Sequence, residues 1–116
     1  MSNYNNKVIH LELSDVDVNT KKIKNVNGTC LVVVYAPWCG HCKNLKPVWE
    51  QLTSQHKDVF LAIDATDKEK GGDKLAQMFG VGGFPTILIF ENGVPVGQHQ
   101  GGRDADSLKK SAKLMK

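Results

Sequence analysis

The chain has 116 residues, of which 41% are hydrophobic, and a formal net charge of +3 at neutral pH. This length suits one compact domain, and the hydrophobic content is ordinary for a globular protein. The lysines are scattered along the chain, which predicts a solvated basic surface and gives no argument for a nucleic-acid partner. The apolar runs are far shorter than a membrane span, so we expect no membrane partner either.

The N-terminal part of the chain has the weakest patterns. Residues 1–6 are polar and rich in asparagine, which predicts a disordered tail ahead of one domain over residues 7–116. The alternation over Lys7–Leu13 predicts a first strand. A weak, β-branched pattern over Val16–Asn25, preceded by Ser14, predicts a short helix.

A strand and the main helix follow, and they meet at a corner. Cys30–Ala36 is apolar at nearly every position, which predicts a central strand buried on both faces. Gly40–Gln55 predicts a helix whose apolar stripe consists of Cys42, Leu45, Val48, Trp49 and Leu52. Pro47 lies inside this helix, and we expect a kink there rather than an end.

The second half of the chain predicts alternating elements: a strand at Asp58–Asp64, a helix at Asp73–Phe79, strands at Ile87–Phe90 and Val94–Gln100, and a closing helix at Asp104–Met115. Asn92-Gly93 predicts a hairpin turn, and Pro95 places the last strand at a sheet edge because proline cannot donate to a ladder. In the closing helix, the residues expected to face inward are Ala105, Leu108, Ala112 and Met115. The order predicts an α/β fold with a mixed central sheet of about five strands flanked by helices on both faces.

Two of the three cysteines, Cys39 and Cys42, lie one helical turn apart at the strand-to-helix corner. This spacing allows them to form a disulfide. Cys39 lies at the helix tip, where unpaired N–H groups favour a thiolate, and a protonated His41 would add positive charge. Cys42 continues the apolar stripe and should face inward. We therefore expect Cys39 to be the attacking nucleophile and Cys42 the resolving thiol.

The segment Ala-Pro-Trp-Cys-Gly-His-Cys-Lys, residues 36–43, resembles the active site of protein disulfide isomerase domains in the thioredoxin superfamily. The similarity extends from about Val8 to Met115, and the Gly40-His41 pair is the isomerase form. The resemblance implies a thioredoxin fold and a protein disulfide oxidoreductase. Its substrates would be protein thiols and disulfides, and the redox-active pair Cys39 and Cys42 would need no bound cofactor.

The resemblance also implies supporting residues around the cysteine pair. Pro85 matches a cis-proline that lies against the pair, and the backbone at Phe84 matches a segment that pairs with an extended peptide. Gly83 would leave that approach open. Trp38 would contact substrate, and Arg103 matches the arginine that modulates the second cysteine.

Two positions depart from the family pattern. A buried acid that exchanges a proton with the second cysteine is replaced by Val33, and the lysine that often pairs with this acid is replaced by Ala62. Losing both together avoids an unpaired buried charge. It also leaves Cys42 without a built-in base, so we expect slow resolution of mixed disulfides.

Other interpretations remain open at this stage. A redox-silent peptide-binding or adaptor module would keep the same fold. A zinc site would need four ligands, and neither a second cysteine pair nor the spacing of His10, His56 and His99 supplies them, so we expect no metal. We expect Cys30 to be a buried free thiol, with a second redox role or a dimer bridge as the alternatives.

Compartment and partners are the least determined features. The N-terminus has no apolar signal core and the C-terminus has no retention signal, which predicts a cytoplasmic protein, or one of the endoplasmic reticulum lumen if the chain is a trimmed piece. We expect a monomer with an electron donor or acceptor that the sequence does not identify. The direction of net electron flow depends on the reduction potential of the pair.

Overall fold

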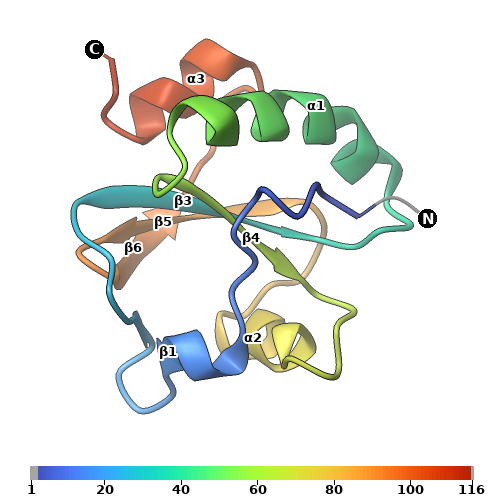
Figure 1. Ribbon diagram of the computed structural model, residues 1–116, viewed down its shortest axis with the longest axis vertical. Coiled ribbons are helices and arrows are strands. Elements are labelled where there is room, and N and C mark those ends of the chain that lie inside the picture. Colours follow the sequence, from blue (N-terminus) through green and yellow to red (C-terminus); the bar gives the residue numbers. More distant parts are fainter. Residues whose placement is uncertain (1–2, 116) are drawn as a thin grey trace.

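The computed structural model describes residues 3–115 and contains a central four-stranded sheet (Figure 1). Its strand order is β4-β3-β5-β6. The strands are β3 (Thr29–Tyr35), β4 (Phe60–Asp64), β5 (Thr86–Glu91) and β6 (Val94–Gln98). The β3–β4 pair is parallel, whereas β5 runs antiparallel to both β3 and β6. The sheet is therefore mixed, with β3 in its interior.

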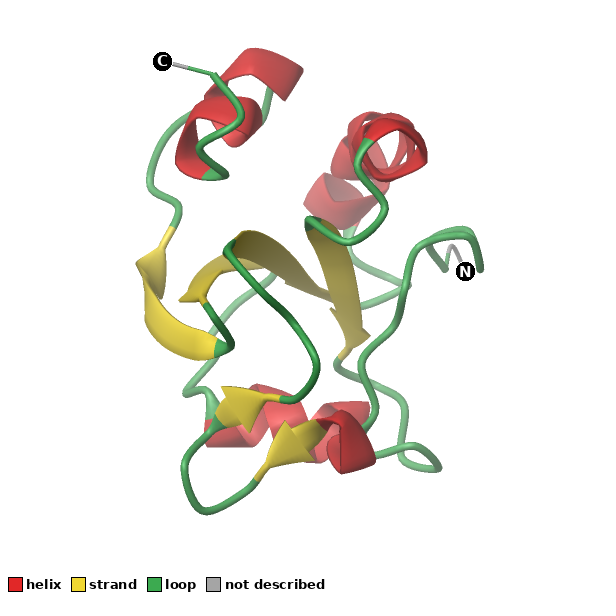
Figure 2. Ribbon diagram, turned by 60° about the vertical axis from the view of Figure 1, so that its left-hand side comes forward, coloured by secondary structure: helices red, strands yellow, loops and turns green. Residues whose placement is uncertain are grey.

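Helices cover both faces of this sheet. Figures 1 and 2 show α1 (Gly40–Gln55) and α3 (Ala105–Ser111) on one face and α2 (Gly72–Met78) on the other. Beside α2 lie a short 3₁₀ helix, η1 (Leu13–Asp15), and a small separate sheet of two strands. Those strands are β1 (Val16–Asp17) and β2 (Lys22–Ile23).

Two hydrophobic clusters pack on the two faces of the sheet, and β3 contributes to both. Leu31, Val33 and Tyr35 belong to the cluster under α1 and α3. Cys30 and Val32 belong to the cluster on the α2 face. All five are buried, as expected for a strand covered on both sides. The C-terminal end of β3 is thus held firmly where the chain turns into α1.

Most of the predicted elements are confirmed. The main helix has the predicted bounds, Gly40–Gln55, and continues through Pro47. The four strands of the central sheet and α2 differ from their predicted ranges by a few residues at most. Pro95 lies in β6, which is an edge strand as expected.

Two elements of the N-terminal region were predicted wrongly. Lys7–Leu13 forms no named strand but a single parallel bridge, in which Leu11 N–H donates to Ala62 O at 2.8 Å. Val16–Asn25 is not a helix, because β1 and β2 pair across a turn that the Asp17 carboxylate closes by accepting the Asn19 N–H. The first of these corrections explains why the central sheet has four strands rather than about five.

The two ends of the domain also differ from expectation. The closing helix is Ala105–Ser111, shorter than predicted; Leu108 and Ala112 are buried, but Met115 is 40% exposed and does not face inward. At the other end, residues 1–2 of the expected disordered tail lie outside the described residues. Tyr4, in contrast, is 3% exposed and belongs to the core cluster under α1.

Candidate active site

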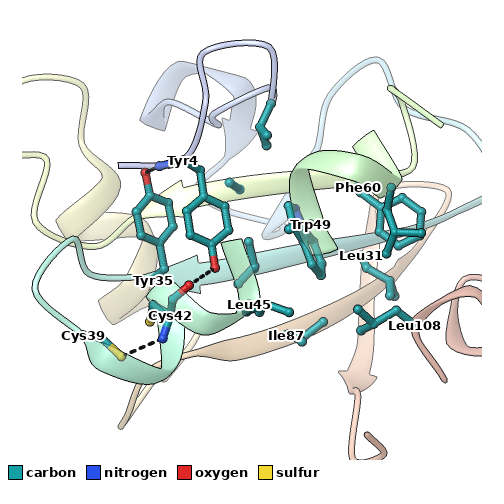
Figure 3. Packing of buried hydrophobic residues seen from close by; sticks show 14 of the residues in the cluster. Tyr4, Leu31, Tyr35, Cys39, Cys42, Leu45, Trp49, Phe60, Ile87 and Leu108 are labelled. Atoms are coloured by element: carbon teal, nitrogen blue, oxygen red, sulfur yellow. Dashed lines mark hydrogen bonds between the residues drawn. The ribbon is translucent and has the colours of Figure 1, made fainter. Parts of the chain in front are cut away.

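Cys39 is the N-cap residue of α1, at the corner where the chain leaves β3. Its backbone is extended, and its Sγ accepts a hydrogen bond from Cys42 N–H at 3.3 Å (Figure 3). A helix N-terminus presents N–H groups without intrahelical partners. The Cys39 sulfur thus occupies the place that a capping oxygen takes in other helices, where a negative charge is stabilised.

The two sulfurs of the pair have different environments. Both cysteines are free thiols in this structure, but Cys39 is 8% exposed whereas Cys42 is 1% exposed. Burial, reinforced by a hydrogen bond with Cys39, raises the pKa of Cys42 to about 12. Cys42 therefore keeps its proton at neutral pH, and Cys39 is the thiol that a large molecule can reach.

The loop before β5 completes the surface around Cys39. The Phe84–Pro85 peptide bond is cis, as expected. The Cys39 thiol donates to the Phe84 carbonyl at a sulfur-to-oxygen distance of 3.6 Å. Gly83 is exposed, and no atom lies within 4 Å of where its Cβ would be, so the backbone beside Phe84 is accessible. An extended chain could approach this carbonyl and the Cys39 sulfur together.

An aromatic pair lies at this loop, formed by the exposed Trp38 and the partly buried Phe84. The Trp38 side chain is 61% exposed and meets the Phe84 ring edge to face, with 5.8 Å between the ring centroids. Large exposed aromatic side chains provide apolar contact area for a partner. Gly40 and His41, also exposed, form the first residues of α1 on the same side.

Arg103 follows β6, and its positive charge affects the ionisation of Cys42. Burial is the main cause that raises the pKa of Cys42 to about 12. A hydrogen bond with the Ala36 backbone and the positive charge of the Arg103 guanidinium both lower this pKa. The preceding loop is fixed by His99, whose Nε2 lies 2.6 Å from the Gly102 carbonyl. Arg103 itself is exposed.

The two departures from the family pattern are neighbours in the sheet. Val33 in β3 lies directly opposite Ala62 in β4, and both are fully buried. Neither side chain can carry a charge or a proton. Two apolar side chains thus face each other at the positions where the family pattern has an acid and a lysine.

Sequence reasoning missed one residue of the site. The Tyr4 hydroxyl donates to the Cys42 carbonyl at 2.8 Å, and the Tyr4 ring stacks on Tyr35 (Figure 3). The one available signal was an aromatic residue inside an otherwise polar tail, since aromatic side chains are usually buried.

A metal site and a membrane-spanning helix are both absent from the part of the chain that the structure describes. Among residues 3–115, no group of three or more His, Cys, Asp or Glu side chains is arranged to hold a metal ion. Within the same described range, none of the helices combines the length and apolar character needed to cross a membrane.

Comparison with known proteins identifies the family. The model of the Thioredoxin family matches residues 8–114. Among curated proteins, "Protein disulfide-isomerase like 2-2" of Arabidopsis thaliana is 46% identical over 93 residues, which cover 78% of this chain and 20% of the relative. "Protein disulfide-isomerase A6" of Homo sapiens is 38% identical over 104 residues, covering 84% of this chain and 22% of the relative.

Solved structures agree on the fold. The J-Trx1 fragment of ERdj5 has a TM-score of 0.71 at 27% identity, covering 94% of this chain and 51% of that one. A mutant thioredoxin from Halobacterium salinarum NRC-1 has a TM-score of 0.67 at 29% identity, covering 98% of this chain and 95% of that one.

The chain therefore belongs to the thioredoxin family, a family of thiol–disulfide oxidoreductases, and its domain is similar to those of protein disulfide isomerases. It spans about a fifth of the length of these curated relatives. The cytoplasmic location expected from the sequence finds no support among them, whereas the endoplasmic reticulum is compatible with them.

Proposed function

We propose that this domain catalyses thiol–disulfide exchange on protein substrates, acting as a reductase, oxidase or isomerase of their disulfides. The Cys39 thiolate attacks one sulfur of a substrate disulfide, and the other substrate sulfur leaves as a thiolate that takes up a proton. Cys42 then loses its proton and attacks the Cys39 sulfur. The bound substrate sulfur leaves, the substrate gains two electrons, and Cys39 and Cys42 end as a disulfide.

The unequal environment of the two sulfurs carries this proposal. Cys39 caps α1 and is 8% exposed, whereas Cys42 lies one turn further in, is 1% exposed and has a pKa raised to about 12. An exchange catalyst needs one thiol that meets the substrate and a second that stays protonated until a mixed disulfide has formed. The reverse sequence of steps would oxidise a dithiol.

Protein substrates suit the surface around Cys39. We infer that Trp38 and Phe84 contact apolar side chains of the substrate, while the accessible backbone at Gly83 and Phe84 pairs with an extended segment. Pro85 shapes this loop, and Arg103 favours the ionised form of Cys42 during resolution. The electron donor or acceptor is a further thiol–disulfide couple.

Reduction of insulin disulfides tests the proposal, with the parent protein compared to Cys39→Ser and Cys42→Ser variants. We expect turnover by the parent and none by Cys39→Ser. Cys42→Ser should accumulate a mixed disulfide with insulin, visible by mass spectrometry, because attack proceeds but resolution does not. Turnover by Cys39→Ser, or a mixed disulfide at residue 42 alone, would contradict the assigned roles.

The compartment and the direction of electron flow belong to the same proposal. On the similarity to protein disulfide isomerases, we infer that the domain works in the endoplasmic reticulum lumen, where oxidation and isomerisation are favoured. Equilibrating the Cys39–Cys42 pair with glutathione measures its reduction potential. A potential near that of thioredoxin would instead favour a reductase.

A redox-silent binding module is a second candidate, favoured by one observation. Val33 and Ala62, in the same hydrophobic cluster as the buried thiol, offer no proton acceptor, while the exposed Trp38 and the partly buried Phe84 would bind a peptide without any redox step. In that case Cys39→Ser would bind unfolded protein as well as the parent does, and neither would reduce insulin.

A further inference from the structure

Tyr4 reaches the active-site helix from outside it. Its side chain is 3% exposed, and its hydroxyl donates to the Cys42 carbonyl at 2.8 Å. Its ring stacks on the Tyr35 ring, with 4.2 Å between the centroids and 16° between the planes. Figure 3 shows the two rings side by side next to Cys42. An N-terminal residue is thus packed against the peptide of the buried cysteine.

Tyr35 is held in place by its own hydrogen bonds. Its hydroxyl accepts the Tyr4 N–H at 3.2 Å and lies 2.8 Å from His10 Nε2. His10 Nδ1 lies 2.9 Å from the Val8 carbonyl, and a carbonyl can only accept, so Nδ1 carries the proton in the neutral ring. His10 Nε2 then accepts from the Tyr35 hydroxyl. This series of hydrogen bonds fixes the surface on which Tyr4 stacks.

The neighbouring residue attaches the same segment further along α1. Asn5 N–H donates to the Glu50 carboxylate, which belongs to a later turn of α1. Residues 4 and 5 therefore contact this helix at two places. This leaves the Tyr4 ring little freedom to move away from Cys42.

We propose that Tyr4 is a positioning residue for the resolving thiol: its ring closes Cys42 off from water, and its hydroxyl fixes the Cys42 peptide. The inference rests on the proposed function, in which Cys42 resolves the mixed disulfide. Desolvation is the largest cause of the raised pKa of Cys42, so the groups that exclude water there set how easily the thiol ionises. With Val33 and Ala62 uncharged, Tyr4 is a polar contact of Cys42 supplied from outside the Cys-Gly-His-Cys segment.

Alkylation of Cys42 by iodoacetamide tests the proposal in a Cys39→Ser background, followed by peptide mass spectrometry across a range of pH. Tyr4→Ala removes the ring that keeps water away from Cys42, so we expect the pKa of Cys42 to fall by about one unit. Below that pKa, the alkylation rate should then rise about tenfold. Tyr4→Phe keeps the ring and removes the hydroxyl, so we expect a smaller rise, about threefold. Asn3→Ala, at an exposed neighbouring position, should leave the rate unchanged.

Cys30 is the internal control for unfolding, because it is buried in the cluster on the opposite face of the sheet. Faster reaction of Cys42 with an unchanged rate at Cys30 supports the proposal. An unchanged Cys42 rate in Tyr4→Ala overturns it. If both cysteines react faster in Tyr4→Ala, the fold has opened and Tyr4→Phe decides: a faster Cys42 alone supports the proposal, and any other result overturns it.

The alkylation readout is independent of substrate turnover. If insulin is not reduced by the parent protein, the proposed function fails, whereas the effect of Tyr4 on Cys42 can still be measured. If insulin is reduced but Tyr4 variants leave the pH profile of Cys42 unchanged, only the role of Tyr4 fails.

Discussion

Cys42 has to lose a proton in order to resolve a mixed disulfide, and two apolar residues of the sheet that share its hydrophobic cluster give it no help. Burial raises the pKa of Cys42 to about 12. Val33 and Ala62, which face each other across β3 and β4, have no group that could take the proton. We therefore expect the proton to leave through solvent or through a group on the substrate, and we expect resolution to be the slow half of the cycle.

Introducing an acid and a lysine together should accelerate that step. In a Val33→Glu, Ala62→Lys variant we expect faster release of the mixed disulfide, because the carboxylate can accept the Cys42 proton while the lysine compensates its buried charge. Single-turnover reduction of insulin measures the release rate. Val33→Glu alone should cost about 3–5 kcal/mol of stability, since its charge is buried without a partner.

The matched control for this prediction is Val33→Gln with Ala62→Lys, which keeps the size and the lysine but cannot take a proton. Equal release rates in the two double variants would show that proton transfer is not what limits the parent protein. Slower release in the Val33→Glu, Ala62→Lys variant than in the parent protein would also contradict the prediction.

Among the elements, α1 and β3 could be predicted from the sequence, and the N-terminal strands could not. The stripe from Cys42 to Leu52 specifies α1 through local periodicity, and the run that includes Val32 and Val34 is apolar at successive positions, as a doubly buried strand requires. β2, in contrast, depends on a distant contact, since Ile23 N–H donates to the Gly93 carbonyl in the β5–β6 turn. No local pattern reports such a contact.

The candidate site divides in the same way. Spacing and the position at the strand-to-helix corner predicted the pair Cys39 and Cys42, and family resemblance supplied the cis bond before Pro85. Tyr4 was out of reach, because its burial depends on the Tyr35 ring and the Cys42 carbonyl, which the fold brings to it. The polar residues around Tyr4 predict a disordered tail, and a single aromatic residue among them does not change that prediction.

The contact between β2 and the β5–β6 turn gives a prediction at the level of elements. Gly93 has φ +84°, and a Cβ there would lie 2.4 Å from the Ile23 carbonyl oxygen. We expect Gly93→Ala to lower the free energy of unfolding by about 1–3 kcal/mol, through backbone strain and displacement of β2. Urea unfolding measures this loss.

Gly97, in the neighbouring strand β6, is the matched control. No atom lies within 4 Å of its Cβ position, so Gly97→Ala should change the free energy of unfolding by about 0.5 kcal/mol at most. Equal losses in the two variants would show that the approach to Ile23 is not what constrains Gly93.

For the molecule as a whole, the buried thiols predict how stability depends on pH. Burial raises the pKa of Cys42 from 9.0 to about 12 and that of Cys30 from 9.0 to about 11. Above pH 9 the unfolded chain therefore releases protons that the folded chain still holds. The folded state binds more protons there, so the free energy of unfolding falls as pH rises from 9 towards 12.

Urea unfolding of the fully reduced protein at several pH values checks this dependence. A Cys30→Ala, Cys42→Ala variant should show a shallower decline above pH 9, although not a flat one. The remaining slope comes from two buried tyrosines, Tyr35, whose pKa burial raises to about 12, and Tyr4, whose pKa burial raises further still. Stability that is constant or increasing in the parent over this range would contradict the assignment.

The location of Cys30 has a consequence for handling and storage. An odd number of cysteines normally invites mispairing under oxidation, but here the sheet separates them, with Cys30 on one side and Cys39 and Cys42 on the other. Within an intact molecule, the pair can only close on itself. Covalent dimers joined through Cys30 should therefore arise from copies that have lost their native structure, which makes such dimers a simple gel-based indicator of damaged material.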